Sequence, residues 1–297
     1  MVAEGSTIAR RALGRQLQKL RKKADMSQNR AAKVLGISPQ TMARLEDGLS
    51  VPSTNDLYMN ALCDHYGVSD EKRRAILAMA REARVSAKNG GGWWRPHIDR
   101  PANDFEPRAF LDHAARRLTA WHVILLPEIV QTPDYRRAVA WTTWPHLPTD
   151  ELDNRIERVA ERQRRLDDST FTVEILLSEA AIREEWGGPS VMAEQRRFLV
   201  EIGHRPNVSI RVVPFRTRGH LGALVGSFSL LEFPLLPHTR FVERPIVHVE
   251  EYTGDLYLER SAEVDRYKAA ISELRRVALS ESDSSARILA ISDEYEN

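Results

Sequence analysis

The chain has 297 residues, of which 42% are hydrophobic and 29% are charged, a composition that is ordinary for globular proteins in a chain long enough for two domains. A single cysteine, Cys63, excludes an intrachain disulfide framework, and its position inside an expected helix predicts a small buried side chain. No apolar run reaches the roughly 18 residues of a membrane span and the first residues lack a signal-peptide core, so we expect a cytoplasmic protein without a membrane anchor.

Charge is divided unevenly along the chain. Residues 1–90 hold 16 Lys and Arg against 9 Asp and Glu, whereas residues 91–297 hold 27 against 33. A basic N-terminal part favours DNA as a partner, because phosphate contacts supply much of the affinity of DNA-binding proteins. Beyond residue 91 the basic residues are 26 Arg and a single Lys, a bias that indicates a GC-rich genome and hence an actinobacterium.

The first expected helix covers residues 8–24. Leu13, Leu17 and Leu20 recur at helical spacing and are expected to face inward. The basic side chains of this helix are expected to point largely outward, either toward phosphates or simply into solvent: Arg10, Arg11, Arg15, Lys19, Arg21, Lys22 and Lys23.

The most informative stretch is residues 27–48, where two short helical patterns flank a tight turn. Residues 28–35 and 39–47 each carry apolar side chains at helical spacing. Ser27 and Ser38 stand where N-caps are needed, and Gly36 permits a left-handed turn between the helices. The stretch therefore predicts a helix, a turn and a second helix.

The second of these helices has a face suited to reading bases in a major groove. Opposite its apolar edge it presents short or planar polar side chains. We predict that bases are read by Gln40, Thr41 and Arg44. Phosphate contact and orientation of the helix are assigned to Ser27, Gln28 and Ser38, with Arg15, Lys19 and Lys22 as weaker candidates. The alternative is a helical hairpin of an ordinary all-α domain, with these residues forming a solvated face.

This stretch resembles the lambda-repressor-like, or xenobiotic-response-element-type (XRE), helix-turn-helix regulators. Their pattern is Ser-Gln, an Ala four residues after the Gln, and Gly-hydrophobic-Ser before the recognition helix; Gln28, Ala32 and residues 36–38 match it. Asn29 and Pro39 depart from common choices in the family. The resemblance implies a DNA-binding transcription regulator. Since one recognition helix reaches only a few base pairs, we expect a homodimer on double-stranded DNA.

Two further helices complete an expected five-helix domain over residues 1–85. One is expected to begin after a Ser53 cap and to end near Tyr66, with Leu57, Ala61 and Leu62 inward; the other covers residues 70–85. Residues 86–104, which contain three consecutive glycines, are expected to be a linker. Trp93 and Trp94 are too apolar for a free tether, so they are expected to dock on a domain or to contribute to a partner or ligand surface.

Residues 105–297 predict a mixed α/β (α+β) domain with a mainly antiparallel sheet. Expected strands begin at Phe171, Val208, Gly226 and Ile246. The expected helices cover residues 108–125, 135–144, 152–166, 178–185, 189–203 and 261–279.

Several sequence segments of this region are similar to the C-terminal domain of WhiJ-like regulators of streptomycetes. They include LLPEIVQTPDYRRA from Leu125, GGPSVMAEQ from Gly187 and RPNVSIRVVPF from Arg205, although residues 126–130 depart from the usual Pro-Gly-Leu-Leu. The resemblance implies a regulator of development that acts with a small protein encoded by a neighbouring gene, in an antitoxin-like arrangement. Such a regulator would be associated with the nucleoid.

No catalytic or metal-ligating pattern stands out in residues 105–297. Its histidines do not pair at i, i+3 or i+4, and Gly219, Gly222 and Gly226 lack the lysine of a phosphate-binding loop. We therefore expect that the protein is not an enzyme and that it binds neither a metal ion nor a cofactor. Two roles remain open for this domain: binding a small partner protein that gates DNA binding, or sensing a small-molecule ligand as a one-component repressor.

Overall fold

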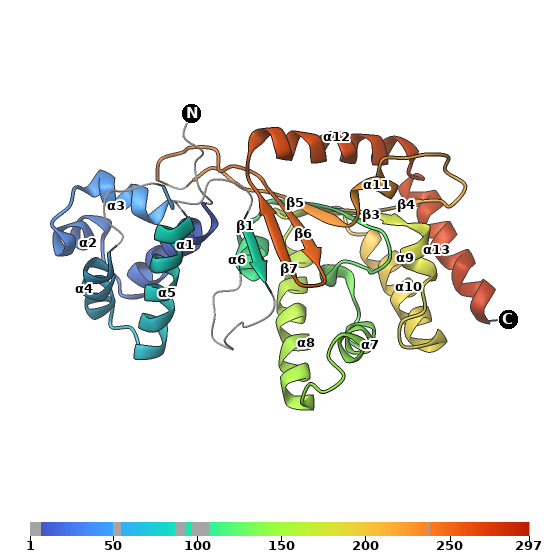
Figure 1. Cartoon of the computed structure of the whole chain (residues 1–297), viewed down its shortest axis with the longest axis horizontal. Helices are drawn as coiled ribbons and strands as arrows, with labels where there is room; N and C mark the ends of the chain where they lie inside the picture. Colours follow the sequence, from blue (N-terminus) through green and yellow to red (C-terminus); the bar gives the residue numbers. More distant parts are fainter. Residues whose placement is uncertain (1–6, 50–54, 87–92, 97–106, 237, 297) are drawn as a thin grey trace. The chain divides into compact units, whose positions relative to one another are not determined.

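The computed structural model describes residues 7–49, 55–86, 93–96, 107–236 and 238–296. Its contacts divide the chain into two compact units (Figure 1). Unit 1 contains residues up to Leu111 together with two later segments, Phe233–Ile246 and Glu251–Ser261. Unit 2 contains Asp112–Glu232, Val247–Glu250 and Ala262–Asn297. In the described part of the chain, no helix is both long and apolar enough to cross a membrane.

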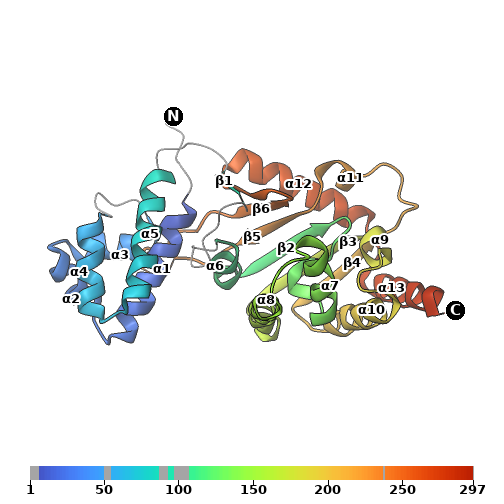
Figure 2. The same ribbon diagram turned by 60° about the horizontal axis from the view of Figure 1, so that its bottom comes forward.

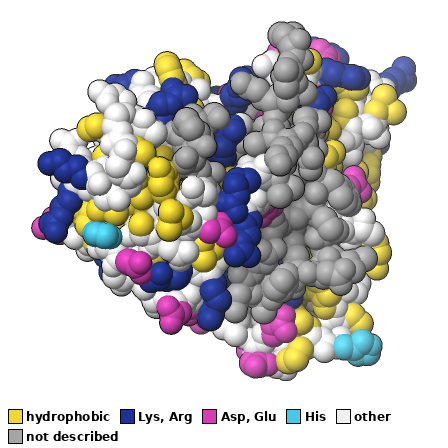
Figure 3. Space-filling model, turned by 60° about the vertical axis from the view of Figure 1, so that its left-hand side comes forward, with side chains coloured by type: hydrophobic (Ala, Val, Ile, Leu, Met, Phe, Trp, Pro, Cys, Tyr) yellow, Lys and Arg dark blue, Asp and Glu magenta, His cyan; other side chains and the backbone are white. Residues whose placement is uncertain are grey.

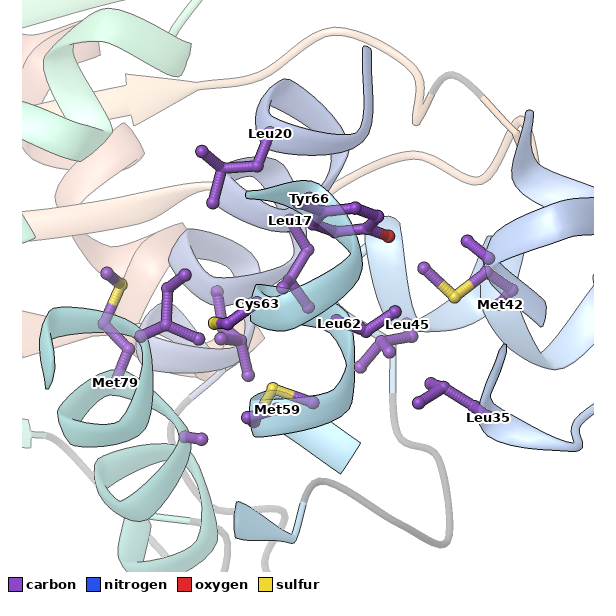
Figure 4. Close-up of a cluster of buried hydrophobic side chains, with 14 of the residues drawn as sticks. Leu17, Leu20, Leu35, Met42, Leu45, Met59, Leu62, Cys63, Tyr66 and Met79 are labelled. Atoms are coloured by element: carbon purple, nitrogen blue, oxygen red, sulfur yellow. The ribbon is translucent and has the colours of Figure 1, made fainter. Parts of the chain in front are cut away.

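Unit 1 begins with a bundle of five helices, as the sequence predicts. Their apolar faces form one core, in which side chains of different helices interdigitate (Figure 4). Leu17 of the first helix, Met42 of the third and Leu62 of the fourth are all fully buried there, and Cys63 is buried beside them. The helices are α1 (Ile8–Lys23), α2 (Gln28–Leu35), α3 (Pro39–Glu46), α4 (Asp56–Tyr66) and α5 (Asp70–Ser86).

Two details of this bundle correct the sequence predictions. Helix α4 is capped by Asn55, whose side chain accepts the Tyr58 N–H at 2.9 Å, and Leu57 is 73% exposed rather than inward. Ser53 lies outside the described residues. In α1 the arginines Arg11 and Arg21 are buried rather than outward. Amphipathic spacing alone missed this because both guanidinium groups are paired with carboxylates that are distant in sequence.

Unit 1 also contains two paired strands that follow the helical bundle in sequence. The expected linker at residues 86–104 includes a strand, β1 (Trp93–Pro96), which pairs antiparallel with β7 (Gly254–Leu258). This strand replaces part of the flexible connection that the glycines predicted. The side chains of Trp93 and Trp94 lie outside what the structure describes, so their expected docking stays a prediction.

Unit 2 is built around strands in the order β6-β5-β2-β3-β4. Strand β3 pairs in parallel with both β2 and β4, whereas β2 pairs antiparallel with β5. The sheet is therefore mixed, and the expectation of a mainly antiparallel sheet is wrong for its β2-β3-β4 part. The bounds are β2 (Arg117–His122), β3 (Thr172–Ser178), β4 (Val208–Val213), β5 (Phe228–Glu232) and β6 (Ile246–Glu251).

Helices connect and cover these strands. Figures 1 and 2 show α7, α8 and α10 on one face of the sheet and α12 across the other. The expected helix at residues 108–125 is instead a short helix followed by β2, whose four central residues are all buried and so show no alternation of buried and exposed positions. The helices are α6 (Pro107–Ala114), α7 (Pro133–Thr143), α8 (Thr149–Gln163), α9 (Glu179–Arg183), α10 (Pro189–Gly203), α11 (Gly222–Val225), α12 (Ser261–Val277) and α13 (Glu281–Glu296), with 3₁₀ turns at Glu128–Val130 and Arg164–Asp167.

Glu174 on β3 makes the stability of unit 2 depend on pH. Burial pushes its pKa up, but hydrogen bonds from Arg275 and the charge of Arg117 outweigh burial and hold the pKa below its ordinary value. A carboxylate with a lowered pKa contributes stability above its unfolded pKa and loses it as the pH falls. We expect the free energy of unfolding to decrease below about pH 5. Chemical denaturation at several pH values measures this decrease, and the free energy of unfolding of Glu174→Gln should fall less with decreasing pH than that of the wild type. An equal pH dependence in the two proteins would contradict the role assigned to Glu174.

Candidate nucleic-acid interface

The predicted helix, turn and helix are present, and the predicted Ser27 and Ser38 caps both form. The Ser27 hydroxyl accepts the Arg30 N–H at 3.2 Å at the start of α2, and the Ser38 hydroxyl accepts the Thr41 N–H at 3.1 Å at the start of α3. Gly36 adopts φ +64°, the left-handed conformation that favours glycine. The local sequence therefore fixes where the two helices begin and how the chain turns between them.

A buried ion pair holds α3 against the rest of the bundle. Arg21 of α1 donates to both oxygens of Glu46, at 2.5 and 2.9 Å, and also to the Met26 carbonyl. Gln28 of α2 donates to Glu46 at 3.0 Å. Because the Glu46 side chain is completely buried, these donors stabilise a charge that would otherwise be costly. Three helices therefore meet at a single carboxylate near the end of α3.

The predicted base-reading residues lie on the outer side of α3. Gln40 and Arg44 are exposed, whereas Thr41 is half-buried. The Thr41 hydroxyl is 2.9 Å from the Ser38 hydroxyl, so it also takes part in the cap. Met42 and Leu45, the predicted inner residues, are buried in the core. The structure thus places the side chains of Gln40 and Arg44 on the surface of the bundle.

The predicted phosphate-contacting residues are divided by the structure into two groups. Lys19 and Lys22 of α1 are exposed, and Figure 3 shows Lys and Arg side chains on the face of the bundle that carries α2 and α4. Gln28 and Arg15 are engaged inside the protein. The Arg15 guanidinium pairs with Glu243 and stacks on Phe110 and Phe233, and burial lowers its pKa. The contacts of Gln28 and Arg15 within the protein orient the helices that carry them.

Close approach of α1 to the end of α3 requires glycine at position 14. A Cβ there would lie 2.5 Å from the Leu45 carbonyl oxygen, 2.6 Å from that of Glu46 and 2.8 Å from the Gly48 nitrogen. These are backbone atoms, which cannot move aside as a flexible side chain would.

We therefore expect Gly14→Ala to lower the free energy of unfolding of unit 1 by about 1–3 kcal/mol or more, although alanine favours helices. Chemical denaturation measures this. The matched control is Gly203→Ala in α10, where the nearest atom is 4.0 Å away and the effect should be neutral or stabilising. Equal effects of the two substitutions would contradict the close packing of α1 and α3.

A segment distant in sequence also contacts the end of α3. We call residues 233–246 the strap; it belongs to unit 1. The Asp47 carboxylate, which follows α3, accepts the Thr239 N–H at 2.7 Å and the His238 N–H at 3.4 Å. The His238 Nε2 lies 3.1 Å from Glu46. Sequence reasoning missed this contact because nearly 200 residues separate its two sides and neither side carries a motif.

Glu243 forms the second attachment of the strap. Its side chain is buried and pairs with Arg15 and, at 3.4 Å, with Arg11, both on α1. Arg11 also donates to the Arg244 carbonyl at 3.0 Å. Burial raises the pKa of Glu243 above its ordinary value, although the charges of Arg11 and Arg15 act in the opposite direction. Among the described residues, no group of three or more His, Cys, Asp or Glu side chains is arranged to hold a metal ion.

Comparison with known families agrees with this two-part organisation. Residues 12–76 match a helix-turn-helix domain, and residues 107–290 match a domain of unknown function, DUF5753. The chain belongs to the DUF5753 family. The helix-turn-helix match supports a DNA-binding regulator. The strap lies within the DUF5753 match, yet it is part of the compact unit that contains the helix-turn-helix. No curated protein and no solved structure matches the chain significantly.

Proposed function

We propose that this chain is a sequence-specific transcription regulator that reads double-stranded DNA with α3. The observation that supports this most strongly is a doubly capped helix-turn-helix whose second helix exposes Gln40 and Arg44. Amide and guanidinium groups are the side chains that pair bidentately with adenine and guanine in the major groove. The buried Arg21–Glu46 pair fixes the position of α3 before DNA binds. Binding therefore does not have to pay for ordering this helix.

We propose further that the regulator binds as a homodimer. A single α3 spans only a few base pairs, so affinity and specificity require two half-sites about one helical turn apart. Exposed Lys19 and Lys22 would then contact phosphates on each half-site. The operator is accordingly expected to be a short palindrome.

For the DUF5753 domain we propose the binding of a small partner protein, encoded by a neighbouring gene, that gates DNA binding in the antitoxin-like, WhiJ-like manner. The sequence resemblance supports this role, and no catalytic role is proposed. The alternative, a small-molecule sensor, calls for an enclosed apolar pocket. A cavity of about 410 Å³ lies at the start of β2, β3 and β4, but charged and polar residues line most of it and Glu174 there is already paired. The cavity therefore gives the alternative little support.

The test is to express the tagged full chain in its host, crosslink, and identify both the DNA and the proteins recovered with it. A short palindromic site together with a stoichiometric small protein supports the proposal. The same site without a protein partner favours the small-molecule sensor. A partner without any enriched DNA sequence contradicts DNA reading by α3.

A further inference from the structure

The strap connects two strands of unit 2, yet it belongs to unit 1. It follows β5 and leads into β6, which are neighbours in the sheet. Two of its side chains, Phe233 and Leu236, are buried, and the Arg11 guanidinium of α1 lies 5.4 Å from the centre of the Phe233 ring. An isolated antiparallel bridge joins Leu235 to Val242 within the strap. The strap is therefore a folded segment with buried contacts of its own to the helical bundle (Figure 1).

The strap holds the C-terminal end of α3 through Asp47. This side chain is buried, and each of its two carboxylate oxygens accepts one backbone N–H of the strap, from Thr239 at 2.7 Å and from His238 at 3.4 Å. The helix dipole disfavours a carboxylate at this end of a helix, and burial removes the charge from water. The two N–H donors offset both costs, because an ionised carboxylate is a strong acceptor. The contact with the strap thus explains a buried acid at this position.

The His238 side chain makes a second contact at the same place. Its Nε2 lies 3.1 Å from Glu46 Oε2 and 2.7 Å from the Nε2 of Gln18 on α1. Glu46 is the same carboxylate that accepts hydrogen bonds from Arg21 and Gln28. The strap therefore reaches α3 at the point where α1, α2 and α3 converge.

The proposed base-reading residue Arg44 lies one helical turn before this contact. The Asp47 N–H donates to the Ala43 carbonyl at 2.9 Å, and the Leu49 N–H donates to the Arg44 carbonyl at 2.9 Å. Since α3 has only eight residues, its stability and position depend on packing contacts rather than on the helix itself. A displacement of Asp47 is consequently a displacement of Arg44.

We infer that Asp47 is a positioning residue for DNA reading, because its contact with the strap holds the end of α3 where Arg44 reaches a base. This rests on the proposed function and names a regulatory link within it. The strap lies inside the DUF5753 match and outside the helix-turn-helix match, and both of its ends continue into strands of the sheet. Operator affinity therefore depends on a DUF5753 segment, and a change in the sheet that moves the strap alters that affinity.

Two other roles for Asp47 lead to different expectations. If Asp47 only braces the fold, its removal lowers protection from hydrogen exchange throughout α1–α5. If it acts through its negative charge, its removal strengthens binding to every duplex, because DNA phosphates are repelled less. Positioning of α3 predicts instead a loss that is confined to α3 and to the operator.

The experiment compares Asp47→Ala and Asp47→Asn in the full chain. Asp47→Ala removes both acceptors, whereas the Asn side chain loses the charge but keeps an oxygen that accepts the Thr239 N–H. Asp64→Ala is the matched control, since Asp64 is a carboxylate of the same bundle that pairs with Arg73 at 2.5 Å. Fluorescence anisotropy measures the affinity of each variant for operator and scrambled duplexes. Hydrogen exchange measures the protection of the backbone amides of α3 and α5.

The inference predicts that Asp47→Ala weakens operator binding about fivefold or more. Its binding to scrambled DNA should change less than about twofold, because phosphate contacts by α1 are retained. Asp47→Asn and Asp64→Ala should keep operator affinity within about twofold of the wild type. In Asp47→Ala the amides of α3 should exchange faster while those of α5 keep their protection.

A second pair of variants tests the contact from the strap. Thr239→Pro removes the N–H donor and should weaken operator binding as Asp47→Ala does, whereas Thr239→Ala keeps the donor and should not. The double variant of Asp47→Ala with Thr239→Pro should bind no more weakly than the weaker single variant, since both remove the same contact.

Unchanged operator affinity in Asp47→Ala, equal losses in Asp47→Ala and Asp47→Asn, or a loss of protection spread over α1–α5 would overturn the inference. So would losses that multiply in the double variant. If wild-type protein does not distinguish its operator from scrambled DNA, the proposed function fails, and the inference fails with it.

Discussion

Arg44→Ala is expected to remove most of the preference of the regulator for its operator while leaving its binding to random DNA nearly unchanged. A guanidinium that pairs bidentately with guanine contributes about 1–3 kcal/mol of discrimination, roughly a five- to 150-fold ratio in affinity. Arg44 is exposed on α3, one turn beyond Gln40, and its removal leaves the buried Met42 and Leu45 in place. Fluorescence anisotropy with operator and scrambled duplexes measures both affinities.

Lys22→Ala is the matched control for this substitution. Lys22 is exposed near the end of α1 and carries a charge without a planar hydrogen-bonding group. Its removal should weaken binding to both duplexes equally and reduce the slope of log affinity against log salt by about 1. If the two substitutions affect operator and random DNA in the same ratio, Arg44 does not read a base.

Glu46→Leu is expected to have the largest effect on stability. The substitution leaves Arg21 buried without its carboxylate and removes the acceptor for Gln28. Removing one partner of a buried ion pair costs about 3–5 kcal/mol, because the remaining charge has lost both water and its counter-ion. Unfolding by denaturant, followed by hydrogen exchange of the backbone amides of α1–α5, measures the loss.

The double substitution Arg21→Met with Glu46→Leu separates this cause from a simple packing defect. Replacing both charges by apolar side chains of similar size is often neutral or stabilising, so the double variant should recover most of the lost stability. A double variant as unstable as Glu46→Leu would show that the ion pair is not what Glu46 contributes.

The helix-turn-helix could be predicted from sequence because its determinants are local. Ser27, Gly36 and Ser38 fix caps and a turn within a dozen residues, and the structure reproduces α2 with the predicted bounds. Burial of Arg21 and Glu46 was not predictable in the same way. Their partners are 25 residues apart, and amphipathic spacing treats every charged residue as exposed.

The sheet was harder to predict than the helices. Strand β2 is buried along most of its length, so its residues do not alternate and they continue the apolar pattern of α6. Strands β3 and β4 are parallel, and helices α9 and α10 form the crossover connection that parallel strands require. The expectation of a mainly antiparallel sheet did not take this connection into account. The strap could not be found from any local pattern, because its contacts with α1 and α3 span about 190 to 230 residues.

The most direct test of DNA reading by α3 is the ratio of two dissociation constants for the wild-type chain, one for the site enriched by crosslinking and one for a scrambled duplex of equal length. Both are measured at the same salt concentration, near 150 mM, since affinity for DNA depends steeply on salt. A specific regulator is expected to bind its site at least about 10³-fold more tightly. A ratio within about tenfold would mean that α3 does not read sequence, and the proposed function would be wrong.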